Sequence, residues 1–236
     1  MQGLIVAAGQ GTRLRDIAAS KPLAMLHGRP LIQHVIEQAR AGGIDEFVVV
    51  TGYEAPPLEA FLRRLSMRGG FPIRVVRNSD WRLANGHSVA AAASSLNERF
   101  VLMMADHLFD PLLLAGLLAA PVTSAEVTLA VDRRLTNPLV DLEDVTRVLT
   151  DDRGSITTIG KLIESYDAFD TGVFLASHAL IDAIGDDINA GGSGGISGGM
   201  MRLAAMGLAA THDIGDAFWL DVDDAIAYAH AERLCA

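Results

Sequence analysis

The chain has 236 residues, of which 50% are hydrophobic and 20% charged, with a formal net charge of −10 and one cysteine, Cys235. An acidic chain excludes a nucleic-acid-binding surface, which needs a basic face, and one cysteine excludes an internal disulfide or a thiolate metal cluster. No apolar run is long enough to span a bilayer, and no basic leader precedes an apolar stretch and a cleavage site. We therefore expect a soluble, cytoplasmic protein without membrane insertion, folded as a single domain over 1–236.

The first predicted element is a buried strand that runs directly into a glycine-rich loop. Residues 4–8 are apolar, and Gly9-Gln10-Gly11-Thr12-Arg13 follows at once. Without a Cβ, the glycines let backbone N–H groups approach phosphate oxygens, and Arg13 and Lys21 add positive charge. The glycine spacing fits neither a P-loop nor a dinucleotide fingerprint. It predicts a nucleoside triphosphate site; the alternative is a tight turn that binds nothing.

Helix and strand patterns alternate through the first 120 residues, which we expect to form a nucleotide-binding half. The patterns predict helices from 31 to the Gly42-Gly43 pair, over 58–65 and over 88–96, and strands over 47–50, 73–76 and 100–104. Such alternation predicts an α/β fold with a mostly parallel sheet and helices on both faces. Ligands then bind at the carboxyl ends of the strands.

From about residue 121 the pattern changes, and we expect an acceptor-binding half with a C-terminal helix. The sequence predicts a strand over 127–131, a hairpin of 145–150 with 155–159, a strand that closes at Phe174, and helices near 178–184 and 200–206. The glycine-rich stretch 190–199 predicts a flexible loop. It is either a mobile flap over the acceptor site or a featureless surface loop.

Three carboxylates follow predicted strand ends. Asp106 comes after strand 100–104, and Asp221 and Asp223 follow Trp219 in a short apolar segment. Carboxylates at this edge can hold Mg²⁺ against triphosphate oxygens, and strand alternation points Asp221 and Asp223 the same way. Asp223 is equally suited to cap a helix over 225–234. His107 is either a metal ligand or, more often in such a position, a structural hydrogen-bonding residue.

Lysine is scarce in this chain. Of the 19 basic residues only Lys21 and Lys161 are lysines. A compact ammonium fits a crowded phosphate pocket differently from a planar guanidinium. The two lysines therefore mark positions where arginine does not serve, or else they are two surface residues left by chance.

Taken together, these motifs resemble the nucleotidyltransferases that activate sugar, alditol and cyclitol phosphates. The shared features are Gly-x-Gly-Thr-Arg-Leu, the Lys-Pro-Leu step at 21–23, the strand-end Asp106 and the late Trp-x-Asp-x-Asp. The run Asp-His-Leu-Phe-Asp-Pro at 106–111 is similar to the cytidylyltransferases that act on myo-inositol 1-phosphate. Segments 78–90 and 159–175 agree with that group.

The resemblance implies a Rossmann-like, GT-A-like fold with a small β-rich insertion on the acceptor side. It implies Mg²⁺-dependent, in-line attack of myo-inositol 1-phosphate on the α-phosphate of CTP, giving CDP-inositol and pyrophosphate. It implies catalytic roles for Arg13, Lys21 and Asp106. It further implies nucleotide binding by Ala8, Gly9, Gly11, Thr12, Arg13, Asn78, Asn85, Gly86 and Ser88, acceptor binding by Lys161, Asp170, Thr171 and Gly172, and metal binding by Asp106, Asp221 and Asp223.

The sequence departs from the family pattern at two places, and it leaves other functions open. Ser20 stands where proline is usual, and Asp224-Ala225 replaces Thr-Pro; neither change removes a charged group. Many relatives carry a fused membrane synthase, so we expect a separate protein to use the product. The alternatives are a cytidylyltransferase for phosphocholine or a phosphonate, a hexose-1-phosphate nucleotidyltransferase, and a catalytically silent nucleotide-binding module.

Overall fold

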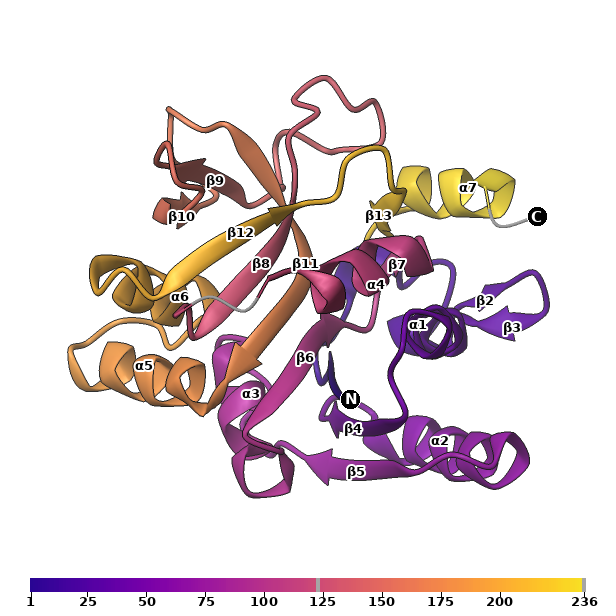
Figure 1. The fold of residues 1–236 in the computed structure, drawn as a ribbon. Helices are drawn as coiled ribbons and strands as arrows, with labels where there is room; N and C mark the ends of the chain where they lie inside the picture. The colour runs from indigo at the N-terminus through magenta and orange to yellow at the C-terminus, as the bar shows by residue number, and fades with distance from the viewer. Residues whose placement is uncertain (122–123, 235–236) are drawn as a thin grey trace.

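The structure, a computed structural model, describes residues 1–121 and 124–234, so Cys235 lies outside the described part. Its centre is a nine-stranded sheet (Figure 1). Across the sheet the order is β10 (Ile156–Gly160), β9 (Arg147–Thr150), β11 (Ala168–Ser177), β6 (Arg99–Met104), β1 (Gln2–Ala7), β4 (Glu46–Thr51) and β5 (Ile73–Arg77). Beside β11 lies β8 (Val127–Asp132), and β12 (Ala209–Asp213) pairs with β8.

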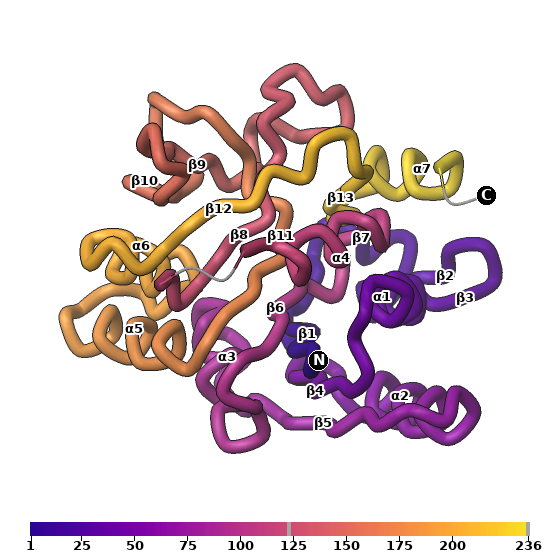
Figure 2. Tube along the Cα trace, in the orientation of Figure 1, coloured from indigo at the N-terminus to yellow at the C-terminus, as the bar shows by residue number. Residues whose placement is uncertain are grey.

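The amino-terminal half is the parallel core that the sequence predicts. Strand β1 pairs in parallel with β4 and β6, and Figure 2 shows its trace inside the fold. Every residue of β1 is buried, and alternate side chains enter two separate cores. Helices α1 (Leu31–Ala41), α2 (Ala55–Gly69) and α4 (Pro111–Ala119) pack into one core, and α3 (Gly86–Ala91), α5 (His178–Asn189) and α6 (Ile196–Ala205) into the other.

Strand β11 joins the two halves of the chain. Its first residues pair with β9, its last five pair antiparallel with β6, and it also pairs with β8. The register against β8 shifts between Asp170 and Phe174. The irregular stretch therefore lies where the strand passes from the second half of the chain to the first.

Two small sheets and the short helices complete the fold. Strand β7 (His107–Phe109) pairs antiparallel with β13 (Trp219–Asp221), so the chain's end returns to the carboxyl end of β6. The remaining elements are the hairpin of β2 (Met25–Leu26) with β3 (Arg29–Pro30), helix α7 (Ala225–Leu234), and the 3-10 helices η1 (Thr12–Leu14), η2 (Lys21–Leu23) and η3 (Ala93–Ser95). Among the described residues, no helix has the length and apolar character needed to cross a membrane.

Three predicted boundaries are wrong. The helix expected over 88–96 is α3 followed by η3, and the strand expected to close at Phe174 continues to Ser177. Only 190–195 of the glycine-rich stretch is a loop, because α6 begins at Ile196. A Cβ on Gly199 would lie 2.6 Å from Ile184 Cγ1, so this glycine lets α6 pack closely on α5.

Candidate active site

The glycine loop leaves β1 at its carboxyl end and wraps around Lys21. Gly11 has a φ of 58°, a conformation that L side chains rarely adopt, and a Cβ there would lie 2.5 Å from Lys21 Cβ. Ala8 is buried, whereas a Cβ on Gly9 would meet nothing within 4 Å. The loop therefore has an open side where backbone groups can meet a ligand.

Lys21 and Asp106 form a largely buried ion pair at this edge of the sheet. The Lys21 side chain is only 10% exposed, and its Nζ lies 2.5 Å from Asp106 Oδ2 and 3.9 Å from Asp221 Oδ1. Burial alone would lower the pKa of Lys21, but the two carboxylates outweigh it and raise that pKa. Burial likewise opposes ionisation of Asp106, yet Lys21 and His107 hold its pKa well below the usual range. Both groups are charged at neutral pH.

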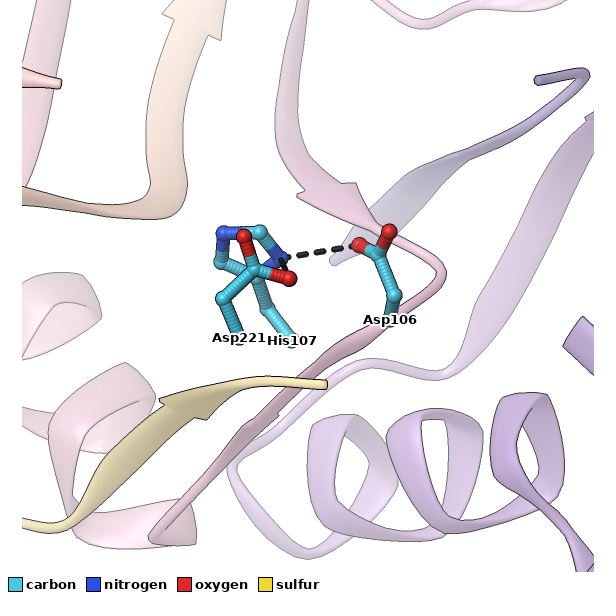
Figure 3. A group of neighbouring side chains, drawn as sticks. All are labelled: Asp106, His107 and Asp221. Atoms are coloured by element: carbon cyan, nitrogen blue, oxygen red, sulfur yellow. Dashed lines mark hydrogen bonds and ion pairs between the residues drawn. The ribbon is translucent and has the colours of Figure 1, made fainter. Parts of the chain in front are cut away.

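His107 lies between Asp106 and Asp221, with the three side chains facing one another (Figure 3). Its Nδ1 is 2.9 Å from Asp106 Oδ1 and 3.6 Å from Asp221 Oδ1. Burial lowers the pKa of His107, but the Asp221 and Asp106 carboxylates raise it to about 9. The imidazolium therefore donates to Asp106. On its other side the ring fits against Gly172, where a Cβ would lie 2.5 Å from His107 Cδ2.

A second cluster of charges surrounds Asp223 and Asp144. Arg13 Nη2 lies 2.6 Å from Asp144 Oδ2 and also pairs with Asp223, and Lys161 pairs with the other oxygen of Asp144. Burial, followed by the neighbouring Asp221, raises the pKa of Asp223 to about 6. The carboxylates of Asp144, Asp221 and Asp223 offer oxygens within 4.8 Å of one another.

The structure decides against Asp223 as the cap of the last helix. Helix α7 begins at Ala225, and Asp224 Oδ1 accepts a hydrogen bond of 2.7 Å from the backbone N–H of Ala227. The alternative in which Asp223 caps this helix is therefore wrong, because the position that precedes the first turn belongs to Asp224. The Asp223 carboxylate is left free to face Arg13.

The carboxylates fit a divalent cation. Asp106 and Asp221, like Asp221 and Asp223, present oxygens close enough to share one ion. Asp221 Oδ1 is buried and has no hydrogen-bond partner among the described residues, and burial raises the pKa of Asp221. Both observations are expected of a hard oxygen ligand in the absence of its cation. A divalent ion would favour the charged form of Asp221.

Two adjoining cavities are lined by these charged side chains together with their neighbours. The smaller, of about 240 Å³, is lined by residues that include Gly9, Gly11, Lys21, Ser88 and Asp106. The larger, of about 610 Å³, is lined by residues that include Lys161, Asp170, Gly172, Asp221 and Asp223. Asn85 and Met104 line both. Of the residues expected to bind the nucleotide, Gly9, Gly11, Asn85 and Ser88 line the smaller cavity, and of those expected to bind the acceptor, Lys161, Asp170 and Gly172 line the larger one.

Several of the expected binding residues make contacts that shape the walls. Asn78 is buried, and its Nδ2 donates to Ser88 Oγ at 3.0 Å. Asn85 Oδ1 accepts from Ile196 N at 2.9 Å, at the first residue of α6. Thr171 is buried and donates to the carbonyl of Ala130, at 2.8 Å. These side chains position the elements that line the cavities.

Two further expected residues differ in exposure. Thr12 is exposed in η1, and Asp170 accepts a hydrogen bond of 2.7 Å from Gly172 N inside the irregular stretch of β11. Burial raises the pKa of Asp170 to about 6. Its carboxyl group therefore gains or loses a proton near pH 6.

Sequence reasoning missed Asp144 and left Trp219 undecided. Asp144 belongs to a run of acidic residues at 141, 143 and 144, which in a sequence alone looks like solvated surface. Trp219 could have stacked on a ligand or packed in the core. It is buried, its Nε1 donates to Asp132 Oδ2 at 2.8 Å, and its ring stacks on His107. Trp219 supports β13 and so the position of Asp221.

Comparison with known proteins places this arrangement among nucleotide-using enzymes. Residues 3–167 match the family model of the MobA-like NTP transferase domain. The bifunctional IPC transferase and DIPP synthase of Rubrobacter xylanophilus is 34% identical over 224 residues, which cover 93% of this chain and 48% of that protein. A protein of the same name from Aquifex aeolicus is 27% identical over 223 residues, with the same coverage of 93% and 48%. The chain spans about half the length of these curated relatives.

Solved structures agree with the sequence matches. The inositol-1-phosphate CTP transferase from T. maritima matches with a TM-score of 0.84 and 25% identity, covering 98% of this chain and 95% of that chain. A UDP-glucose pyrophosphorylase complexed with UDP-glucose matches with a TM-score of 0.80 at 17% identity, covering 98% and 97%, which shows a common fold alone. The α/β, GT-A-like fold expected from the sequence is confirmed.

Proposed function

This chain belongs to the MobA-like NTP transferase family, a family of nucleotidyltransferases, and we propose that it transfers the cytidylyl group of CTP to myo-inositol 1-phosphate. The observation that carries the proposal is the pair of adjoining cavities with cations and carboxylates at their boundary. CTP occupies the smaller cavity and its mouth, and the phosphorylated polyol occupies the larger. The names of relatives at 34% and 25% identity support this choice of substrates.

The reaction is a substitution at the α-phosphorus of CTP. An oxygen of the acceptor phosphate, already an anion, forms the new bond to phosphorus, and the bond between the α-phosphorus and the bridging oxygen breaks. Pyrophosphate leaves with that electron pair, so the attacking atom needs no general base. The enzyme's work is to bring two polyanions together and to stabilise the charge that develops.

Cationic side chains carry out that work. Lys21 neutralises charge at the α-phosphate, because its largely buried ammonium is held by Asp106 at the wall of the smaller cavity. Arg13 and the backbone of the glycine loop bind the β- and γ-phosphates. Lys161, which lines the larger cavity, binds the acceptor phosphate. The amide of Asn85 and the hydroxyl of Ser88 face the base.

Asp106, Asp221 and Asp223 would hold Mg²⁺. When bound, the ion supplies a Lewis acid that neutralises phosphate oxygens and the departing pyrophosphate. His107 holds the Asp106 carboxylate in one orientation from the side opposite Lys21. Removal of the divalent cation with a chelator should abolish turnover, and Mg²⁺ should restore it.

The experiment is a substrate matrix followed by pyrophosphate release. The protein is incubated with Mg²⁺, each of four nucleoside triphosphates, and myo-inositol 1-phosphate, glucose 1-phosphate or phosphocholine. Release with CTP and myo-inositol 1-phosphate above all other pairs is the expected result. Faster release with glucose 1-phosphate or phosphocholine would mean that this compound, and not myo-inositol 1-phosphate, is the acceptor. No release with any pair would favour a silent nucleotide-binding module.

A further inference from the structure

Asp144 contacts two cations that the proposed function assigns to different substrates. One oxygen lies 2.6 Å from Arg13 Nη2, in the glycine loop, and the other pairs with Lys161, at the end of β10. These cations are 148 positions apart in the sequence, and one carboxylate joins them. Asp144 therefore lies between the cation assigned to the nucleotide and the cation assigned to the acceptor.

The exposure of these groups shows which of them a ligand can reach. The side chains of Arg13 and Lys161 are 51% and 53% exposed, whereas that of Asp144 is 28% exposed. An arriving anion can thus approach both cations from the solvent side. Burial opposes ionisation of Asp144, but Arg13 and Lys161 keep its pKa well below the usual range, so the carboxylate is charged.

The backbone around Asp144 is fixed. Asp141 accepts a hydrogen bond of 2.9 Å from Glu143 N through its side chain and one of 2.9 Å from Val145 N through its carbonyl. Arg147 also donates to the carbonyl of Leu142, at 3.0 Å. The carboxylate is consequently presented at a defined position, where the side chains of Arg13 and Lys161 contact it.

We propose that Asp144 is a positioning residue that holds Arg13 and Lys161 side by side in the free enzyme and yields each of them to a substrate phosphate. This inference rests on the proposed function for the identity of the two substrates. The carboxylate acts as an internal anion that competes with phosphate for the same donors. It occupies donors of both cations that free phosphate would otherwise take, while Arg13 also keeps its contact with Asp223.

Competition between the Asp144 carboxylate and phosphate for the same cations predicts how phosphate affinity changes when Asp144 is removed. Partly exposed ion pairs contribute little to stability, so removing Asp144 should leave the fold intact. A phosphate then binds without first breaking those pairs, and its affinity rises. Loss of one such pair corresponds to at most about a fivefold change in affinity, and Asp144 makes two of them.

The test compares Asp144→Asn with Glu143→Gln by calorimetric titration of inorganic pyrophosphate without metal. Both substitutions remove one negative charge, but Glu143 is exposed and has no ion pair among the described residues. We expect Asp144→Asn to lower the Kd by about fivefold or more and Glu143→Gln to change it by less than about twofold. Equal effects would mean that only overall charge matters, and would overturn the proposal.

Kinetics separate this role from a structural or metal-binding one. For Asp144→Asn the KM values for both substrates should fall together, whereas a damaged site would raise them. A lower kcat at unchanged KM, or a higher Mg²⁺ requirement, would overturn the proposal. Asp144→Ser removes the same charge and serves as a second variant should the first misfold. If wild-type protein releases no pyrophosphate with any acceptor, the proposed function fails, while the titration still decides the role of Asp144.

Discussion

Gly86 is the position where the structure makes the sharpest stability prediction. It opens α3 beside the nucleotide cavity, and the loop before α6 crosses directly over it. A Cβ there would lie under 3.0 Å from the carbonyl oxygen of Gly194 and 3.0 Å from Ile184 Cγ2. Because the first of these atoms belongs to the backbone, no side-chain rotation relieves the clash.

Two opposing effects decide the sign of Gly86→Ala. Alanine favours a helix over glycine by at most about 1 kcal/mol. Overpacking in a closed interior costs about 1–3 kcal/mol, and contact with backbone places this site toward the upper end. We therefore expect a net loss of about 1–2 kcal/mol in the free energy of unfolding.

Gly185→Ala is the matched control. Gly185 lies inside α5, and a Cβ there would meet nothing within 4 Å, so only the helix preference remains. This variant should gain about 0.5–1 kcal/mol. Urea unfolding followed by circular dichroism measures both changes. If Gly86→Ala is as stable as Gly185→Ala, the close approach of the 190–195 loop to α3 is wrong.

Further variants test the charges and the support of the site. Lys21→Ala and Asp106→Ala should each lower pyrophosphate release by about 10²–10³-fold with an unchanged circular dichroism spectrum, because each removes about 3–4 kcal/mol of transition-state stabilisation; near-normal turnover would contradict the assignment. Since burial raises the pKa of Asp170 to about 6, the folded chain retains a proton that the unfolded chain releases at about pH 4. Asp170→Asn should therefore raise the free energy of unfolding by about 3 kcal/mol above pH 6, with the gain vanishing below about pH 4, and a gain independent of pH would refute this. Trp219→Phe removes one hydrogen bond to the buried Asp132, whose Oδ2 also accepts from Asn137 and Arg134, and should cost about 1 kcal/mol in urea unfolding; no loss would show that this hydrogen bond does not contribute to stability.

The parallel core could be predicted because its determinants are local. An apolar run such as β1 is buried on both faces, and glycines at its carboxyl end and after α1 mark where each element stops. The glycine loop was also predictable, since its spacing limits what a backbone turn can hold. Asp106 followed from the same pattern, as the first acidic residue beyond β6.

The parts that escaped prediction depend on contacts between distant residues. Helix α6 begins inside a glycine-rich stretch because Asn85, 111 positions earlier, accepts a hydrogen bond from Ile196 N. The hydrophobic side of α6 then packs on α5, which outweighs the low helix preference of glycine. The contacts of Asp144 with two cations exist only in the folded chain, where the end of β10 and the glycine loop lie next to it. Nothing in its local sequence distinguishes it from a surface acid.

The balance of charge at the site explains why a divalent cation belongs to the proposed reaction. Five carboxylates, those of Asp106, Asp144, Asp170, Asp221 and Asp223, face four cationic groups, Arg13, Lys21, Lys161 and His107, whose pKa is about 9. A site without excess positive charge cannot accept a triphosphate and a second phosphate unless a cation is added. The raised pKa values of Asp221 and Asp223 show where that charge is lacking. The same two carboxylates lie at the boundary of the cavities, where the reacting phosphates would meet.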